Sequence, residues 1–357
     1  MKIKLQTAEA LVFGGAIMGG GGGGSYEEGL KLAQLALDLG SPQILSLREI
    51  DPQAWVITSS LVGAPAAKDK FVKPMDYVRS MAKVCGALDE QVGGIIQNEM
   101  GGLASANGLI QSAVLGLPII DAPCNGRAHP IAAMGSLGLH ARKGYHSVQA
   151  ACGGDPDQGR RLELLVEGSL ESCSALVRAA SVQAGGFVAV ARNPVQAAWL
   201  KDSAAVGGTR ATISLGRVFL EALQSGSSPE EKVAAHLGGE VVARGKVARI
   251  DLKSEGGFDL GLVVLDSGHE MPFWNEYILI EAEGRRLYTF PDLIATFDLA
   301  TFRPVSSAEI AEGMEVAVVA AKKDRLILGG GMRDRSLFLR VEEAVGRPVV
   351  PFVFGEA

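Results

Sequence analysis

A run of consecutive glycines, Gly19–Gly24, is the feature that most constrains how this chain can fold. It stands between a short apolar segment, Ala10–Phe13, and a helix-like segment, Tyr26–Leu39, for which Ser25 is the expected N-cap. Because glycine lacks a Cβ, the run can adopt positive φ, and other groups can approach its backbone closely. Two interpretations are open: a loop whose N–H groups bind an anion or a carboxamide-like substrate at a helix N-terminus, or a flexible linker or tight turn. We favour the loop, because a linker is unusual inside so regular a pattern. No Gly-Lys-Ser/Thr sequence follows, so the run is not a phosphate-binding P-loop.

The composition is that of an ordinary globular protein. The 357 residues, 47% of them hydrophobic, are enough for two or three packed units. The net charge of −6 without a basic run argues against a nucleic-acid partner, and no uninterrupted apolar stretch is long enough to span a membrane. The N-terminus has no apolar h-region, so we expect no signal peptide. Four cysteines without a CxxC spacing favour reduced thiols: Cys85, Cys124, Cys152 and Cys173. We expect a cytoplasmic protein that acts on a small molecule and forms a homo-oligomer.

The first part of the chain alternates between strand-like and helix-like segments. Strands are expected at Ile44–Leu47, Trp55–Val62, Gly93–Ile96, Pro118–Asp121, Ser147–Cys152 and Gly186–Ala191, and Glu9–Phe13 fits either a strand or a helix end. Helices are expected at Tyr26–Leu39, Asp76–Leu88, Ala104–Leu115, Arg161–Ala180, Asn193–Leu200 and Thr209–Leu223. This order predicts an α/β domain over residues 1–236, with a mixed or parallel sheet covered by helices.

The second part is rich in strands. Alternating apolar residues are found in Glu240–Ile250, Gly257–Leu265, Glu276–Glu281, Arg286–Thr289, Leu293–Asp298 and Glu315–Ala320. We therefore predict a smaller β-rich domain over residues 237–325, a barrel or a sandwich, followed by a tail over residues 326–357 that returns to the first domain.

Polar residues follow the strand expected at Gly93–Ile96. Asn98 and Glu99 come at its carboxyl end and precede Gly101 and Gly102. In open α/β sheets, ligands bind in crevices at the carboxyl ends of strands, so these residues are candidates for catalysis or substrate binding. Alternatively, Glu99 caps the next helix or pairs with an arginine.

A second group follows the strand that ends at Asp121. Cys124, Asn125, Arg127 and His129 lie within the next residues. Arg127 could hold a carboxylate, His129 could transfer a proton, Asp121 could orient it, and Cys124 could act as a nucleophile if its pKa were lowered. The alternative is an Arg–Asp ion pair that stabilises the loop, with Cys124 an inert buried thiol.

A third candidate group lies in the β-rich part. His269 and Glu270 are expected at an exposed hairpin tip, whereas Asn275 and Glu276 beside Trp274 could line a pocket.

A metal site is left open. Glu99, Asp121, His129 and His146 could supply mixed nitrogen and oxygen ligands for a divalent metal, but no HxH, HExxH or CxxC spacing supports it.

Several segments together resemble the S-methyl thiohydantoin desulfurase family, which is associated with hydantoinase- and oxoprolinase-type enzymes. The segments are GGGGGGSYEEG, NEMGG, LPIIDAPCNGRAHP, ARGKVARIDLKSEGGFDLG, FWNEY and FPDLIATFD, and they span nearly the whole chain in the family's order. The matching positions are Gly21, Gly22, Gly23, Gly24, Glu99, Gly101, Gly102, Asp121, Gly126, Arg127, Pro130, Asn275, Glu276 and Asp292. The chain departs from the family pattern at Pro123, His129 and Ile131. The resemblance implies a two-part α/β protein that hydrolytically removes the sulfur substituent of a thiohydantoin.

We therefore expect a hydrolase that converts an S-methyl thiohydantoin-like ring to a hydantoin. Asp121 or Glu99, with His129, would activate water, and Arg127 would anchor a substrate carboxylate. We expect developing negative charge to be stabilised by the backbone N–H groups of Gly20, Gly21, Gly22, Gly23 and Gly24. The alternative is a non-catalytic small-molecule-binding or regulatory subunit that partners a hydantoinase- or oxoprolinase-type enzyme. The hypothesis of nucleotide binding has less support, because no acidic residue stands at the expected ribose-binding position.

Overall fold

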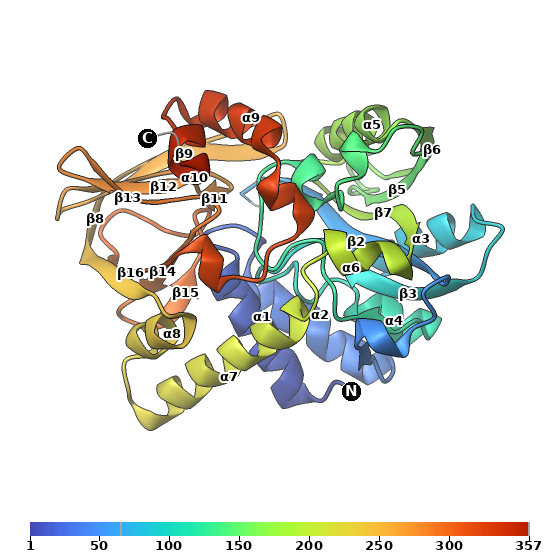
Figure 1. Cartoon of the computed structure of the whole chain (residues 1–357), viewed down its shortest axis with the longest axis horizontal. Coiled ribbons are helices and arrows are strands. Elements are labelled where there is room, and N and C mark those ends of the chain that lie inside the picture. The colour runs from blue at the N-terminus through green and yellow to red at the C-terminus, as the bar shows by residue number, and fades with distance from the viewer. Residues whose placement is uncertain (65, 356–357) are drawn as a thin grey trace.

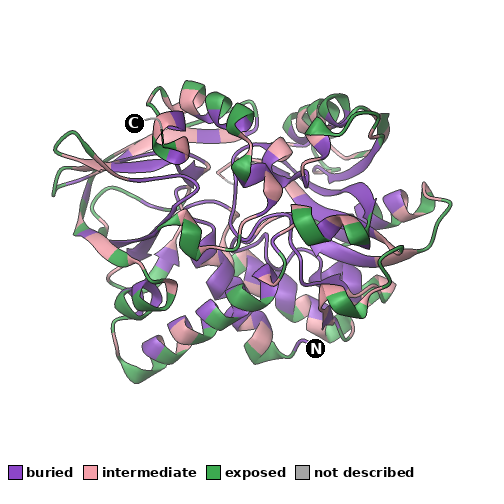
Figure 2. Ribbon diagram, in the orientation of Figure 1, coloured by how far each residue is buried: buried purple, intermediate pink, exposed green. Residues whose placement is uncertain are grey.

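The computed structural model describes residues 1–64 and 66–355. Residue 65, in the loop expected at residues 63–73, and residues 356–357 of the expected tail lie outside the described residues. Figure 1 shows two lobes, with a sheet in blue to green at the right, a sheet in yellow to orange at the left, and helices below and between them. Figure 2 shows that the buried ribbon is concentrated where the lobes meet, whereas exposed residues lie on the outer helices and turns.

The first sheet is mixed. Its strands are β1 (Ile44–Leu45), β2 (Trp55–Gly63), β3 (Val92–Gln97), β4 (Ile119–Ile120), β5 (Ser147–Gly153), β6 (Leu162–Gly168) and β7 (Phe187–Gln196). They are ordered β1-β4-β3-β2-β7-β5-β6, and the first four run parallel while β7, β5 and β6 pair antiparallel. The carboxyl ends of β2, β3 and β4 therefore lie at one edge of the sheet.

The second sheet is antiparallel and bends at its longest strand, β8 (Glu240–Glu255). Its other strands are β9 (Phe258–Leu265), β10 (His269–Trp274), β11 (Glu276–Tyr277), β12 (Leu279–Ala282), β13 (Arg285–Thr289), β14 (Leu293–Asp298), β15 (Arg303–Val305) and β16 (Glu315–Ala321). The start of β8 pairs with β16 and its end pairs with β9, so the two halves enclose a shared apolar core. A mixed α/β sheet with a second β-rich part confirms the predicted fold class.

The helices are α1 (Leu5–Met18), α2 (Tyr26–Leu39), α3 (Pro74–Gly86), α4 (Leu109–Leu115), α5 (Leu170–Gln183), α6 (Leu200–Ser203), α7 (Gly208–Ser225), α8 (Pro229–Leu237), α9 (Arg335–Val345) and α10 (Val350–Phe354). The largely apolar α1 is buried and packs along α7, where Gly14 and Gly216 let the two backbones approach closely. In the described part of the chain, no helix combines the length and the apolar character needed to cross a membrane.

The expected C-terminal tail contacts both lobes. Its helix α9 packs on β10, and Phe338 joins Phe290 in an apolar cluster. Before the helix, the N–H of Gly329 donates to the amide oxygen of Asn125 in the first lobe.

Several sequence-based boundaries are wrong. The helix expected at Arg161–Ala180 is instead strand β6 followed by α5, because residues 162–168 alternate in burial and Ser169 caps a helix only from residue 170. The first half of the helix expected at Asn193–Leu200 is the end of β7, which continues along β2 past Asn193, whose φ is +55°; a 3-10 turn follows at Ala197–Trp199. The expected helix at Ala104–Leu115 begins only at Leu109. The ambiguous segment Glu9–Phe13 is helical, and β10 and β15 were not expected.

Candidate functional site

The first part of the glycine run joins the two lobes. The carbonyl of Gly20 accepts from the N–H of Tyr277 at 2.8 Å, and that of Gly21 accepts from the N–H of Ser307 at 2.9 Å. Gly20 has a φ of +56°, and a Cβ there would lie 2.5 Å from Nη2 of Arg127. A Cβ at Gly22 would collide with the carboxyl group of Glu276. We call this contact between Gly20–Gly22 and the second sheet the seam; it requires glycine because protein atoms fill the space beside the backbone.

The last two glycines differ from the first because they line a pocket. Gly23 packs against the backbone of Gly101, and its carbonyl accepts from the N–H groups of Leu103 and Ala104. The N–H groups of Gly23 and Gly24 donate to no acceptor within the described residues, although both residues border the pocket. They are therefore available to a bound molecule.

The pocket has a volume of about 50 Å³ and lies between the carboxyl ends of β2 and β3 and the start of β11. We call it the polar pocket, after the polar residues of its lining: Asn98, Glu99, His129, Arg178, Arg192, Asn275 and Glu276. Both lobes contribute to it. It is much smaller than an ordinary ligand cleft, which occupies about 300–1,000 Å³.

A chain of hydrogen bonds holds His129 neutral. Its Nδ1 lies 3.0 Å from the carbonyl of Ile131, an acceptor, so Nδ1 carries the proton and Nε2 does not. The amide Nδ2 of Asn98 donates to this Nε2 at 3.1 Å, and Arg192 orients the amide by donating to its Oδ1 at 2.7 Å. Burial and the nearby positive charge of Arg192 lower the pKa of His129 to about 3. His129 therefore does not serve as a base at neutral pH.

Glu99 has the properties of a general base. Its Oε2 lies 3.4 Å from Nε2 of His129 and accepts from the N–H of His129 at 3.3 Å. Burial raises the pKa of Glu99 to about 7 against the lowering effects of the His129 N–H and Arg192. A carboxyl that titrates near neutrality accepts and returns protons readily.

Glu276 is a second buried carboxyl in the same pocket. Burial, followed by repulsion from Glu99, raises the pKa of Glu276 well above its usual value, while Arg127 opposes this shift. Its Oε2 has no hydrogen-bond partner among the described residues. The raised pKa favours the protonated carboxyl, which can donate a hydrogen bond to a ligand.

Arg127 does not reach the polar pocket. It is fully buried, and its Nη1 donates to the carbonyls of Pro291 and Asp292. Its guanidinium group lies over the aromatic ring of Phe290. Its Nη2 faces Gly20 and has no hydrogen-bond partner within the described residues. Arg127 is therefore not in a position to anchor the carboxylate of a molecule bound in the polar pocket.

Three other candidates also lie outside the pocket. Asp121 accepts from the N–H of Arg210 at 3.1 Å, at the N-terminus of α7, where a carboxylate is favourable. Cys124 is buried against Thr58, and burial raises its pKa to about 11, so it remains a thiol at neutral pH. Asn125 donates to the carbonyl of Met134 and holds its loop in place.

The remaining candidates have mixed positions. Gly101 and Gly102 pack against the glycine run and Tyr26 rather than line the pocket. Asn275 lines it with a φ of +58°, and its Oδ1 accepts from the N–H of Asp259 at 2.9 Å.

The proposed metal ligands do not assemble. His146 is exposed beside Glu167, and Asp121 lies at α7. Over residues 1–64 and 66–355, no three His, Cys, Asp or Glu side chains form a group that could hold a metal ion.

Arg178 and Arg192 were missed by the sequence analysis. Arg192 lies within β7, where a strand was expected to end at Ala191 and a helix to begin. An arginine directly after the apolar run Phe187–Ala191 was the available signal. Arg178 lies on α5 and is fixed at the pocket rim by donating to the carbonyl of Gly257 at 2.7 Å.

Comparisons with known proteins agree with this two-lobed arrangement. The family model described as the S-Me-THD-like N-terminal domain matches residues 6–158, and the model described as the S-Me-THD-like C-terminal domain matches residues 169–328. Among solved structures, the chain is similar to the X-ray crystal structure of a protein from Chromobacterium violaceum. The sequence identity is 20% and the TM-score 0.68, over 97% of this chain and 96% of that chain, and this likeness shows the fold alone. No curated protein matches the chain.

Proposed function

Because the chain belongs to the S-Me-THD-like family, we propose that it is a hydrolase that converts an S-methyl thiohydantoin-like ring to the corresponding hydantoin. The observation that carries this proposal is Glu99, a carboxyl with a pKa of about 7 in a pocket bordered by the unpaired N–H groups of Gly23 and Gly24. Base and charge-stabilising donors are the two parts that hydrolysis of an amidine-like carbon needs.

In the proposed reaction, water adds to the ring carbon that carries the S-methyl group. Glu99 accepts one proton from this water as the new C–O bond forms, and the C=N electrons move to the ring nitrogen. The N–H groups of Gly23 and Gly24, with protonated Glu276, stabilise the negative charge there. The C–S bond then breaks, and methanethiol leaves with the proton that Glu99 accepted. The second water proton moves to the ring nitrogen, which leaves a carbonyl beside an N–H.

The remaining pocket residues have positioning roles in this proposal. Asn98, which Arg192 orients, donates to Nε2 of His129 and so occupies its lone pair. The proton taken from water therefore stays on Glu99. The rate is therefore expected to rise with pH up to about 7, as Glu99 ionises.

The test is turnover by the purified chain, measured as methanethiol release and hydantoin formation. Glu99→Gln is expected to reduce kcat by about 10²–10⁴-fold, the usual contribution of a general base, while the variant stays folded. Glu343→Gln, at an exposed glutamate on α9, is the matched control and should turn over substrate as the natural chain does. Full activity of Glu99→Gln would overturn the assignment. A chain that binds hydantoins but converts no thiohydantoin would instead support a binding or regulatory subunit.

A further inference from the structure

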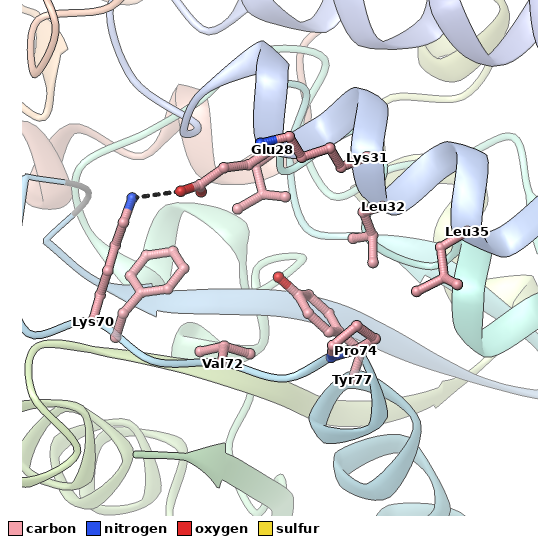
Figure 3. Close-up of a pocket in the computed structure, with 10 residues that line it drawn as sticks. Glu28, Lys31, Leu32, Leu35, Lys70, Val72, Pro74 and Tyr77 are labelled. Atoms are coloured by element: carbon pink, nitrogen blue, oxygen red, sulfur yellow. Dashed lines mark ion pairs between the residues drawn. The ribbon is translucent and has the colours of Figure 1, made fainter. Parts of the chain in front are cut away.

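A second cavity lies beside the polar pocket. We call it the apolar cavity: it has a volume of about 320 Å³ and lies between α2 and the segment that leads into α3. Figure 3 shows Leu32, Leu35, Val72 and Tyr77 around it, with the charged groups towards one side. This volume falls within the range of ordinary small-molecule sites, whereas that of the polar pocket does not.

The hydroxyl of Tyr77 marks the cavity as a binding site. Tyr77 is only 6% exposed, and Figure 3 shows its hydroxyl directed into the cavity. The hydroxyl has no hydrogen-bond partner among residues 1–64 and 66–355. Burial raises the pKa of Tyr77, so the group stays a neutral phenol that can donate. Because the hydroxyl faces the open cavity, it can donate to an acceptor bound there, and such a hydrogen bond contributes about 0.5–1.5 kcal/mol.

Two of the three charged side chains that border the apolar cavity pair with each other. Glu28 on α2 and Lys70 on the facing segment form an ion pair at 3.0 Å, which bridges the two walls. Lys31 is the third charged residue, and the rest of the lining consists of leucine, valine, proline and aromatic side chains. The lining therefore suits an apolar group that carries one hydrogen-bond acceptor.

The apolar cavity and the polar pocket share a wall. Phe187 lines both, while Leu103 lines the cavity and its neighbour Ala104 lines the pocket. A Cβ on Gly24 would lie 2.9 Å from the Cβ of Leu103. The end of the glycine run and Leu103 therefore lie together between the apolar cavity and the polar pocket. A molecule whose reacting ring lies beside Glu99 has only these side chains between it and the apolar cavity.

On the basis of the proposed function, we infer that the apolar cavity is the subsite for an apolar substituent of the substrate ring. The substrate class is a five-membered cyclic amide that carries an aryl or branched alkyl group with a hydrogen-bond acceptor for Tyr77. In this arrangement the reacting ring lies beside Glu99 in the polar pocket, and its substituent extends past Phe187 into the apolar cavity.

The first test is a substrate series in which the ring carbon carries hydrogen, methyl, isobutyl or benzyl. For the natural chain, kcat/KM should increase by about 10- to 100-fold from hydrogen to benzyl, as expected for burial of a leucine- or phenylalanine-sized group. Leu35→Trp fills the cavity and should remove this gain while the unsubstituted ring reacts as before. Leu339→Trp, at an exposed leucine of α9, is the control and should keep the gain. An equal kcat/KM for all four substrates would overturn the inference, since a cavity that holds only water gives no such preference.

A second variant tests the hydroxyl. Tyr77→Phe should reduce kcat/KM for a pyridylmethyl substituent by about 5- to 10-fold and leave the benzyl substrate unchanged, because only the former offers an acceptor. Equal losses for both substrates would overturn the role of the hydroxyl.

Binding of 5-benzylhydantoin, measured by calorimetry, separates this inference from the proposed function. If the natural chain binds it and Leu35→Trp does not, the subsite is supported even when no substrate is turned over. If turnover occurs but the two proteins bind 5-benzylhydantoin equally, the subsite is wrong and the proposed function stands.

Discussion

The two parts of the glycine run contrast with each other. In the seam, the space beside Gly20 and Gly22 is filled by Arg127 and Glu276 from elsewhere in the chain. At Gly23 and Gly24, the backbone borders the polar pocket, and its N–H groups have no acceptor within the described residues. One run of identical residues therefore serves interlobe packing at one end and leaves binding groups free at the other.

Two buried arginines repeat this contrast. Arg127 donates to backbone carbonyls at the seam and lies outside the pocket, whereas Arg192 lines the pocket and orients Asn98. Both are almost inaccessible to solvent. The arginine that the sequence motif predicted as a ligand-binding group is thus the one whose observed contacts are all internal.

The largest effect that would sharpen this comparison is expected from Arg127→Met. It leaves Glu276 without its nearest positive charge and the carbonyls of Pro291 and Asp292 without their donor. A buried acceptor left without its donor typically destabilises a protein by about 1–3 kcal/mol, and here two carbonyls lose theirs. Urea denaturation measures this loss, and Arg285→Met, at an exposed arginine, should be nearly neutral. If Arg127→Met unfolds at the same urea concentration as the natural chain, the seam does not depend on this guanidinium.

An intermediate effect is expected from Gly20→Ala, for which Gly116→Ala is the matched control. Both glycines have positive φ, +56° and +73°, so an alanine at either position is disfavoured by about 1–2 kcal/mol. Only at Gly20 does the added Cβ also meet Arg127, which adds overpacking of about 1–3 kcal/mol; at Gly116 the space is open. Thermal and urea denaturation compare the two. Equal losses would show that backbone conformation alone, and not close packing at the seam, requires glycine.

The third prediction concerns the pH dependence of stability at the pocket end. The folded-state pKa of Glu99 is about 7, above the usual value of 4.5, so the folded protein binds a proton that the unfolded chain releases between these values. Stability contributed by protonated Glu99 is therefore lost as the pH rises from about 4.5 to about 7. Glu99→Gln removes this dependence. The free energy of unfolding of the variant, relative to that of the natural chain, should therefore increase from pH 5 to pH 8. Parallel pH profiles for the two proteins would contradict the raised pKa.

The sequence was a good guide to the elements and a weaker guide to their contacts. Apolar alternation and strand–helix order predicted the mixed sheet and the strand-rich second part, because these patterns are local. The helix expected at Arg161–Ala180 is wrong in its first part, where Leu162, Leu164 and Val166 alternate with more exposed residues as in a strand. The extension of β7 to Gln196 depends on its pairing with β2, which no local pattern reveals.

The same limit applies to the candidate site. Asn98, Glu99 and His129 could be chosen as polar residues that follow strands, and the structure brings them together in the polar pocket. Asp121 looked equivalent, yet β4 delivers it to the N-terminus of α7. The direction in which a residue leaves its strand is determined by packing between distant segments, so sequence adjacency did not separate Asp121 from Glu99.

The position of β7 has a consequence for how this chain is made. Trp55 in β2 lies opposite Gln196 in β7, so a central pairing of the first sheet joins the segment matched by the N-terminal family model to the segment matched by the C-terminal one. A chain cut between residues 158 and 169 would expose the edges of both β2 and β5, and unpaired edges promote aggregation. During synthesis from the N-terminus, β2 therefore cannot complete its pairing with β7 until residue 196 has left the ribosome. Formation of this sheet is thus a late and non-local folding step.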